Sequence, residues 1–262
     1  SSLTTTKVSL IITPTFATEP VQCLVVGQGR DLTCTTVEAQ QVVKIFPDFA
    51  RECSSYLKEQ HNGKALEPGE VFCCDLKSND AAVKASFVIS AYVGEMNTKN
   101  ILKLGESVKN ATRTIMECAD ALQCPSICFC PFSSQIDTFG IDKKFWLMGI
   151  HELFVAVMTY YTENRYSCNM MDIRLTVSTE QDALDAQKIL DSDFQQYKQR
   201  GAQASNRITT AVKNAPVPSG VDLDKKSSSS AAADDEPVKK EKDQEEAELD
   251  PAKYYVGDWT MI

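Results

Sequence analysis

Val21-Gln22-Cys23-Leu24-Val25-Val26-Gly27 is the stretch of sequence that decides the fold class. Its almost continuous apolar run, ended by a glycine, predicts a β-strand that is buried on both faces. Strands of this kind belong to parallel sheets whose two faces are covered by helices. We therefore expect an α/β domain built on a largely parallel sheet.

The segments on either side of this strand alternate between strand and helix patterns. Ser178, with Gln181 three residues later, fits a helix N-cap and capping box, and Pro47 is expected to kink or divide the first helix. Alternating strands and helices imply crossover connections and a three-layer α/β/α architecture with a mixed, largely parallel sheet. We expect further strands over residues 7–13, 70–75, 86–93, 126–132 and 171–177, and helices over residues 36–59, 97–122, 142–161 and 178–190.

The charge of the chain is concentrated near its C-terminus. The 262 residues carry a net charge of −9, and residues 222–250 alone account for −6 of it. The remainder is nearly neutral, which argues against a nucleic-acid partner, because such partners bind basic faces. Apolar runs fall far short of the ~20 residues of a membrane helix, and residues 1–7 lack the pattern of a secretory signal. We expect no membrane partner.

The composition divides the chain into a folded part, residues 1–213, and an acidic low-complexity tail, residues 214–262. The folded part includes a polar helical extension at residues 194–213. Charged and small residues dominate the tail, so we expect it to be disordered. Its aromatic end, residues 254–262, is either an unstructured terminus or a docking motif that folds back on the domain or captures a protein partner. The candidate docking residues are Tyr254, Tyr255, Trp259 and Ile262.

Ten cysteines lie mostly within apolar strand and helix patterns, where they behave as small buried hydrophobes. Because they lack a framework spacing, we expect reduced thiols and a cytoplasmic or nuclear location. Zinc is the alternative for Cys124, Cys128 and Cys130. It is disfavoured because no second cysteine or histidine pair follows and His61 and His151 stand alone. We expect no metal site.

Two loops carry the residues that suit a phosphate group. The first is Gly27-Gln28-Gly29-Arg30, in which glycines permit close backbone approach and Arg30 is an anion ligand; the alternative is a simple turn with a solvated arginine. The second spans residues 133–140, where Ser133, Ser134 and Gln135 either donate to a phosphate or cap a strand end. No Ser/His/Asp or Cys/His set is evident, so we expect no catalytic residues.

The order of elements over residues 8–190 resembles the macro domain family. The resemblance rests on the strand 21–27, on Gly69-Glu70-Val71-Phe72, on the strand 86–94 and on Ser126-Ile127-Cys128-Phe129-Cys130-Pro131. It implies an ADP-ribose cleft at the carboxyl ends of the parallel strands, where doubly wound sheets hold ligands. The candidate ligand residues are Gly27, Gln28, Arg30, Ser133, Ser134, Gln135, Phe139 and Gly140.

The sequence departs from the family at each ligand loop. Glu19 is the only acidic residue where the family has an early aspartate, Gln28 stands in the loop where hydrolytic members have an asparagine, and residues 32–41 contain no glycine. We therefore expect a non-catalytic interaction or structural module with a weak nucleotide-type pocket and no cofactor. The alternative is an ADP-ribose reader that uses Gln28, Ser134, Gln135 and Gly140; an ADP-ribosyl hydrolase is less favoured.

Overall fold

The computed structural model describes residues 5–76, 78, 83–94, 101–130, 132, 143–164, 167–213 and 254–261. The chain forms two compact units. The first, called the core unit here, comprises residues 1–198 together with residues 251–262, and the second comprises residues 199–250. The buried residues, among those whose burial the structure describes, belong to the core unit. The expected tail disorder concerns residues 214–250, which lie outside the described part of the chain.

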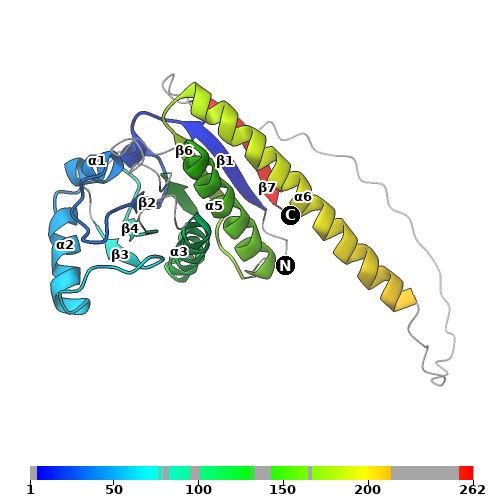
Figure 1. Cartoon of the computed structure of the whole chain (residues 1–262), viewed down its shortest axis with the longest axis horizontal. Coiled ribbons are helices and arrows are strands. Elements are labelled where there is room, and N and C mark those ends of the chain that lie inside the picture. The colour runs from blue at the N-terminus through cyan, green and yellow to red at the C-terminus, as the bar shows by residue number, and fades with distance from the viewer. Residues whose placement is uncertain are drawn as a thin grey trace, which may run out of the picture. The chain divides into compact units, whose positions relative to one another are not determined.

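The core unit is built on a seven-stranded sheet in the order β3-β4-β2-β5-β6-β1-β7. The five inner strands are parallel to one another, and the two edge strands, β3 and β7, run antiparallel to their neighbours. This mixed, largely parallel sheet confirms the predicted fold class (Figure 1). The strands span Thr6–Ile12 (β1), Cys23–Gly27 (β2), Val71–Asp75 (β3), Phe87–Ala91 (β4), Ser126–Phe129 (β5), Asp172–Val177 (β6) and Tyr254–Met261 (β7).

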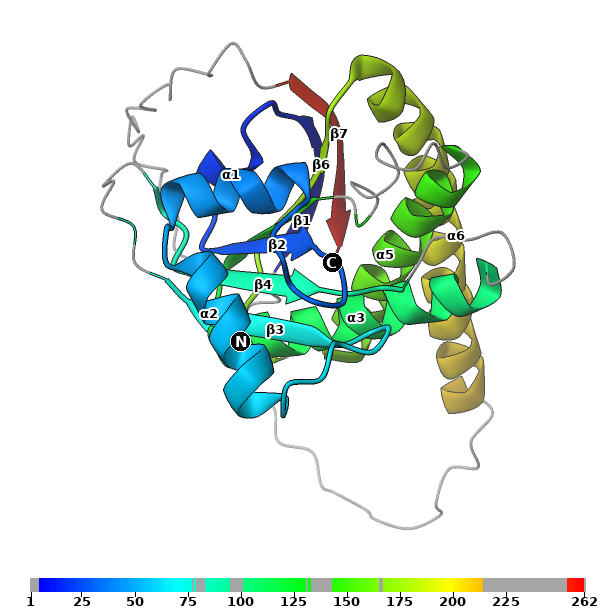
Figure 2. The same cartoon turned by 60° about the vertical axis from the view of Figure 1, so that its left-hand side comes forward.

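Helices cover both faces of the sheet, which gives the expected three layers (Figures 1 and 2). One face packs against α1 and α2, and the opposite face packs against α3, α5 and the first part of α6. The helices span Phe16–Thr18 (η1, a 3₁₀ turn), Val37–Ile45 (α1), Phe49–Ser55 (α2), Tyr56–Gln60 (η2, a π-helical turn), Ile101–Ala121 (α3), Lys143–Asn164 (α5) and Glu180–Lys213 (α6).

Strand β2 separates two hydrophobic cores. Its alternate residues point to opposite faces, so Cys23 and Val25 enter the core beneath α3 and α5, whereas Leu24 and Val26 enter the core beneath α1 and α2. All five residues of β2 are buried. The strand is therefore covered on both faces, as its apolar run predicts, and its carboxyl end at Gly27 emerges between the two helical layers.

The junction predicted at Pro47 is confirmed, and one helix boundary differs from the sequence prediction. The helix expected over residues 36–59 is divided into α1, α2 and η2, with Phe46 and Pro47 between α1 and α2. The prediction of Ser178 as the N-cap of α6 is wrong. Thr179 takes that role, because its Oγ1 accepts a hydrogen bond from the Asp182 N–H at 3.1 Å and donates to the Asp182 carboxylate at 2.7 Å.

The aromatic end of the chain forms β7, the edge strand beside β1. Trp259 and Met261 are buried, at 3% and 1% exposure, and both belong to the core beneath α5 and α6. A docking motif at this end was expected either to fold back on the domain or to capture a protein partner, and the structure shows it folded back on the domain. Tyr254 and Tyr255 pair with Ile12 and Ile11 in the sheet, and Ile262 lies outside the described residues.

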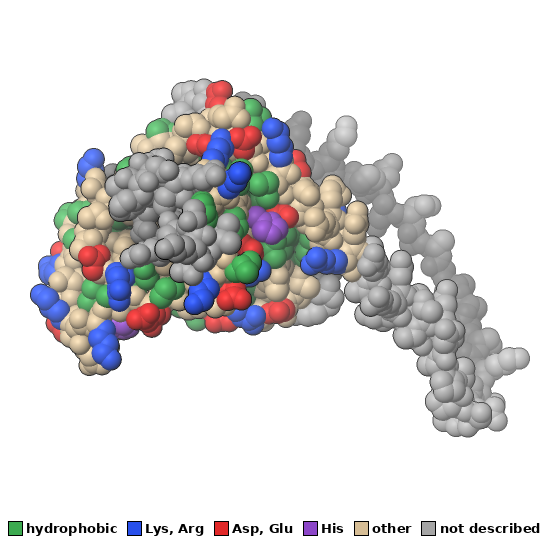
Figure 3. All heavy atoms as spheres, viewed as in Figure 1, with side chains coloured by type: hydrophobic (Ala, Val, Ile, Leu, Met, Phe, Trp, Pro, Cys, Tyr) green, Lys and Arg blue, Asp and Glu red, His purple; other side chains and the backbone are tan. Residues whose placement is uncertain are grey.

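The visible surface of the described residues mixes charges of both signs. In Figure 3, Lys and Arg side chains lie among Asp and Glu side chains over the face shown. Ion pairs such as Lys109–Glu152 and Arg113–Glu117 join neighbouring side chains. None of the helices in the described part of the chain combines the length and the apolar character needed to span a membrane.

Candidate functional site

The carboxyl ends of β2 and β4 lie at the same edge of the sheet because the two strands are parallel neighbours. The loop after β2 runs from Gln28 to Thr36 and leads into α1, and the chain after β4 continues through Tyr92, Val93 and Gly94. Open parallel sheets hold their ligands at this edge. The candidate site is therefore built from these two segments and from the helix α3 that follows β4.

Gly27 precedes the loop at a position that is tightly packed against the backbone of Phe132. A Cβ at this residue would lie 3.2 Å from the Phe132 Cα. The Gly27 carbonyl accepts a hydrogen bond from Thr36 Oγ1 at 3.0 Å, and the same hydroxyl accepts the Ala39 N–H at 3.3 Å as the N-cap of α1. Thr36 thus ties the end of the strand to the start of the helix and occupies one of the N–H groups that the helix terminus would present.

Gln28 points into the protein interior and is 1% exposed. Its Oε1 accepts the Cys34 N–H at 2.9 Å, and its Nε2 donates to Ser90 Oγ at 2.7 Å and lies 3.7 Å from Cys53 Sγ. The side-chain amide therefore links the loop to β4 and α2. Both of its polar atoms are engaged within the protein, so it is not directed toward a ligand.

Leu32 and Cys34 give the loop its turns with left-handed backbone angles, φ of 50° and 55°. Glycine adopts such angles at the least steric cost, so side chains here impose strain. Both side chains are buried in the core beneath α1 and α2. The Leu32 N–H donates to the Gly29 carbonyl at 3.0 Å, and the Cys34 N–H is taken by Gln28. Two of the amides of this loop are therefore bonded internally.

A thiol pair lies beneath this loop. Cys34 Sγ and Cys53 Sγ are 4.0 Å apart. The hydrogen bond with Cys53 lowers the pKa of the Cys34 thiol, and the same hydrogen bond together with burial raises the pKa of Cys53. Cys34, at 8% exposure, is the more accessible of the two.

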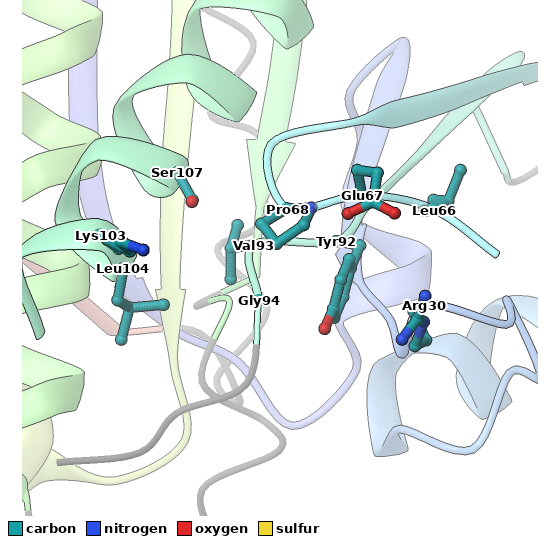
Figure 4. Close-up of a pocket in the computed structure, with 10 residues that line it drawn as sticks. All are labelled: Arg30, Leu66, Glu67, Pro68, Tyr92, Val93, Gly94, Lys103, Leu104 and Ser107. Carbon is teal, nitrogen blue, oxygen red and sulfur yellow. The ribbon is translucent and has the colours of Figure 1, made fainter. Parts of the chain in front are cut away.

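A pocket of about 390 Å³ opens beside this loop. Figure 4 shows Lys103 and Ser107 of α3 on one side and the Glu67–Pro68 segment with the Tyr92 ring on the other. Arg30 comes from the loop after β2. Gly94 reaches the wall with φ of 101°, an angle that favours glycine.

The charge of this pocket suits an anion. Arg30 and Lys103 are both exposed, and neither forms an ion pair with another residue of the described part of the chain. Among the described residues that line it, Glu67 is the single acidic one. Lys103 and Arg30 lie on opposite sides of the pocket (Figure 4), and each can form a charge-assisted hydrogen bond with a carboxylate or phosphate group; Ser107 is a further donor on the α3 side.

A second pocket, of about 340 Å³, lies between α2, η2 and the edge strand β3. Its lining includes the acidic residues Glu52, Glu59 and Asp75 and the Tyr56 ring, which stacks on Phe72 at 4.3 Å between centroids. Burial, and secondarily the charge of Glu70, raises the pKa of the Tyr56 phenol. This pocket has the opposite charge from the first.

The structure brings together only some of the candidate ligand residues that the sequence predicted. Of the candidate ligand residues, Arg30 lines the first pocket, while Gly27 and Gln28 are built into the protein interior. Ser133, Ser134, Gln135, Phe139 and Gly140 lie outside the described residues. The lysine and serine of α3 were not anticipated. They lie beside a helical apolar face, and their only signal is their position in the first two turns of the helix after β4.

Glu19, considered as a substitute for the family aspartate, has a different role in this structure. It is 1% exposed, and its Oε2 accepts a hydrogen bond from Arg174 Nη1 of β6 at 3.1 Å. Arg174 also contacts Asp172 at 2.8 Å. Glu19 is therefore one carboxylate of an ion triad in the fold.

Comparison with known proteins identifies the fold. No family model matches the chain, and no curated protein matches its sequence. The Oceanobacillus iheyensis macrodomain with MES bound is 15% identical, with a TM-score of 0.59, over 75% of this chain and 96% of that one. A mutant of that macrodomain with ADPR is 16% identical, with a TM-score of 0.57, over 73% of this chain and 96% of that one. The Trypanosoma brucei macrodomain in complex with ADP is 15% identical, with a TM-score of 0.53, over 70% of this chain and 68% of that one. At these identities the likeness shows a macro domain fold.

Proposed function

From this macro domain fold, we propose that the chain is a non-catalytic interaction module in which the loop after β2 no longer cradles a diphosphate. The observation that carries the proposal is the hydrogen bond from the Cys34 N–H to Gln28 Oε1, which closes the loop on itself. A diphosphate held by a loop needs several free N–H groups at close range. Here the loop buries the side chains of Gln28, Leu32 and Cys34 and bonds two of its amides internally.

The energetic consequence is large. Each charge-assisted hydrogen bond contributes ~1.5–3 kcal/mol, so the loss of two weakens binding by roughly two to four orders of magnitude. Catalysis is disfavoured for a separate reason. The family resemblance places an asparagine in this loop for hydrolytic members. The amide side chain that this loop does carry, Gln28, is bonded to Ser90 and Cys34 inside the protein.

Calorimetry with ADP-ribose tests the proposal. We expect no heat of binding at ~0.1 mM ligand and no release of ADP-ribose from a modified protein, as the lost hydrogen bonds imply. Saturable binding with a Kd of about 10 μM or tighter would contradict it. Loss of that binding in a Ser134→Ala, Gln135→Ala double variant would then support the reader function.

The pocket between β4 and α3 supports a second candidate function, weak binding of a small nucleotide-type anion. Its support is the pair of cations Arg30 and Lys103, which line one cavity without ion-pair partners among the described residues. We expect millimolar binding of ADP followed by NMR, weakened about tenfold by Arg30→Ala or Lys103→Ala, the loss of one charge-assisted bond. Lys44→Ala, at an exposed lysine of α1, is the matched control. Equal affinities in all three variants would exclude the pocket.

A further inference from the structure

Strand β7 fills a binding site that the rest of the core unit constructs for it. The Trp259 ring packs edge-on against Phe154 of α5, with 5.3 Å between centroids, and its Nε1 donates to Asp191 Oδ1 of α6 at 3.0 Å. Along the strand, Trp259 pairs with Val8 and Met261 with Thr6. Without β7, the backbone of β1 would be an open sheet edge beside an unfilled tryptophan site, which is a receptor for an added antiparallel strand.

This receptor fits the sequence of β7 closely. Gly257 and Trp259 lie on the same face of the strand, and a Cβ at Gly257 would approach the Trp259 ring to 3.1 Å. A larger residue at this position would require the indole to shift by a few tenths of an ångström. On the exposed side, Asp258 forms an ion pair with Lys7 of β1 at 3.0 Å. A ligand for this edge therefore needs Gly-Asp-Trp in register, followed two residues later by Met, and this chain carries that sequence.

The covalent link to this strand is long enough to let it complete either its own core unit or that of another copy. Between Lys213, the end of α6, and Tyr254, the start of β7, lie forty residues. A strand on a long tether competes for its site at an effective concentration in the millimolar range. A second copy of the chain presents the same strand with the same contacts, so the balance between the two depends on the tether and on protein concentration.

We propose that β7 exchanges between two copies of this chain, each inserting its C-terminal strand along the β1 edge of the other in a closed twofold dimer. Reciprocal exchange preserves the Trp259–Asp191 and Lys7–Asp258 contacts in both halves. The inference is independent of any ligand in the pocket beside β4.

The geometry of α6 and β7 gives a decisive variant. Gln187 lies beside Gly257 and Asp191 bonds Trp259, so the helix and the strand run in the same direction. Measured along this common direction from the Asp191–Trp259 contact, Lys198 lies ~10 Å further on and Tyr254 lies ~16 Å back. The distance between Lys198 and Tyr254 is therefore roughly 25 Å. Deletion of residues 199–250 leaves three residues between them, which reach at most ~14 Å. In this short-tether variant β7 cannot reach its own β1 edge, but it can reach that of a second copy.

Light scattering across a concentration series tests the exchange. The full chain should dimerise only as it approaches millimolar concentration, and the short-tether variant should dimerise at a concentration at least ~100-fold lower. Replacement of residues 199–250 by a 52-residue Gly/Ser tether should restore the behaviour of the full chain. Trp259→Ala in the short-tether variant should return it to monomer. A short-tether monomer, or a dimer that survives Trp259→Ala, would overturn the proposal.

A second measurement uses the full chain and remains decisive if the short-tether variant does not fold. Unlabelled and isotopically heavy copies are mixed at ~0.5 mM, partly unfolded in urea and refolded together. Refolding at this concentration favours capture of a partner's strand. The products are analysed by native mass spectrometry. We expect mixed-mass dimers from the native sequence and none from a Trp259→Ala pair. An absence of mixed dimers from the native sequence would contradict the exchange.

Discussion

The backbone N–H of Cys34 donates to the side-chain Oε1 of Gln28 across 2.9 Å, and this one hydrogen bond joins the two ends of the loop that follows β2. Gln28 also donates to Ser90 on the neighbouring strand. The loop is therefore held by the interior of the protein. Its conformation depends on a buried amide and not on a bound molecule.

Replacement of Gln28 by alanine should destabilise the fold. It leaves the Cys34 N–H without its acceptor and opens a cavity beneath the loop, so we expect the free energy of unfolding to fall by about 2–3 kcal/mol. Urea denaturation measures this change. Gln40→Ala, at an exposed glutamine of α1, is the control and should change stability by less than ~0.5 kcal/mol. Similar values for the two variants would show that the Gln28 contacts are unimportant.

Replacement of Trp259 by alanine should be costly, because the residue is 3% exposed and contacts both Phe154 and Asp191. We expect a loss of about 3–5 kcal/mol, typical of a buried tryptophan. Thr260→Ala, at the exposed neighbouring position of the same strand, should lose no more than ~0.5 kcal/mol. Thermal unfolding followed by circular dichroism compares the two. An unchanged melting temperature in the Trp259 variant would mean that β7 contributes nothing to the core.

Thiol reactivity should be uneven along the chain. Burial raises the pKa of Cys73 to about 12 and raises that of Cys74, whereas the hydrogen bond with Cys53 lowers the pKa of Cys34. Because the thiolate is the reactive form, a disulfide reagent at pH 8 should modify Cys34 first. Mass mapping of the first modified peptide checks this.

The control for that experiment is Cys34→Ser, which should remove the fast phase. Denaturation without reductant should then expose the remaining nine thiols of this variant, because all ten cysteines of the chain are free. Rapid labelling at Cys73 in the native protein would contradict the expected order.

Tyr160 should make stability fall at alkaline pH. Its hydroxyl donates to Asp120 Oδ2 at 3.2 Å, and burial followed by the charge of Asp120 raises its pKa. Because its pKa is higher in the folded state, Tyr160 contributes its full stabilisation at pH values below ~10, the pKa of tyrosine in the unfolded chain. This contribution is lost as the pH rises above ~10, because the tyrosine of the unfolded chain ionises first. Tyr160→Phe should cost ~1 kcal/mol at pH 7 and little at pH 11. A difference between the two proteins that stays constant with pH would exclude this linkage.

The sequence predicted the elements that depend on local pattern. The apolar run at residues 21–26 and the helical periodicity near Ile115 and Leu153 encode their own burial, and both lie in the cores where expected. Pro47 correctly marked a junction. The fold class followed from the alternation of these segments, because crossover connections leave few other arrangements.

The site depends on contacts between residues that are distant in sequence. Gln28 looks like a polar loop residue until β4 brings Ser90 beside it, 62 residues later, and Glu19 looks available until Arg174 reaches it from 155 residues away. No local pattern contains such pairs. The C-terminal strand did carry a signal, since Gly257, Trp259 and Met261 alternate with polar residues, but its isolation after a long acidic segment hid the sheet edge to which it belongs.

The place of β1 in the sheet has a consequence for the order of events during synthesis. This first strand pairs with β6, made some 160 residues later, and with β7, the last strand of the chain. A nascent chain therefore emerges with an apolar strand whose two neighbours do not yet exist, and long-range pairings of this kind form slowly. Until β7 has been made, that edge stays open to other chains, a condition in which chaperones act. The sheet is completed only after β7 has been synthesised.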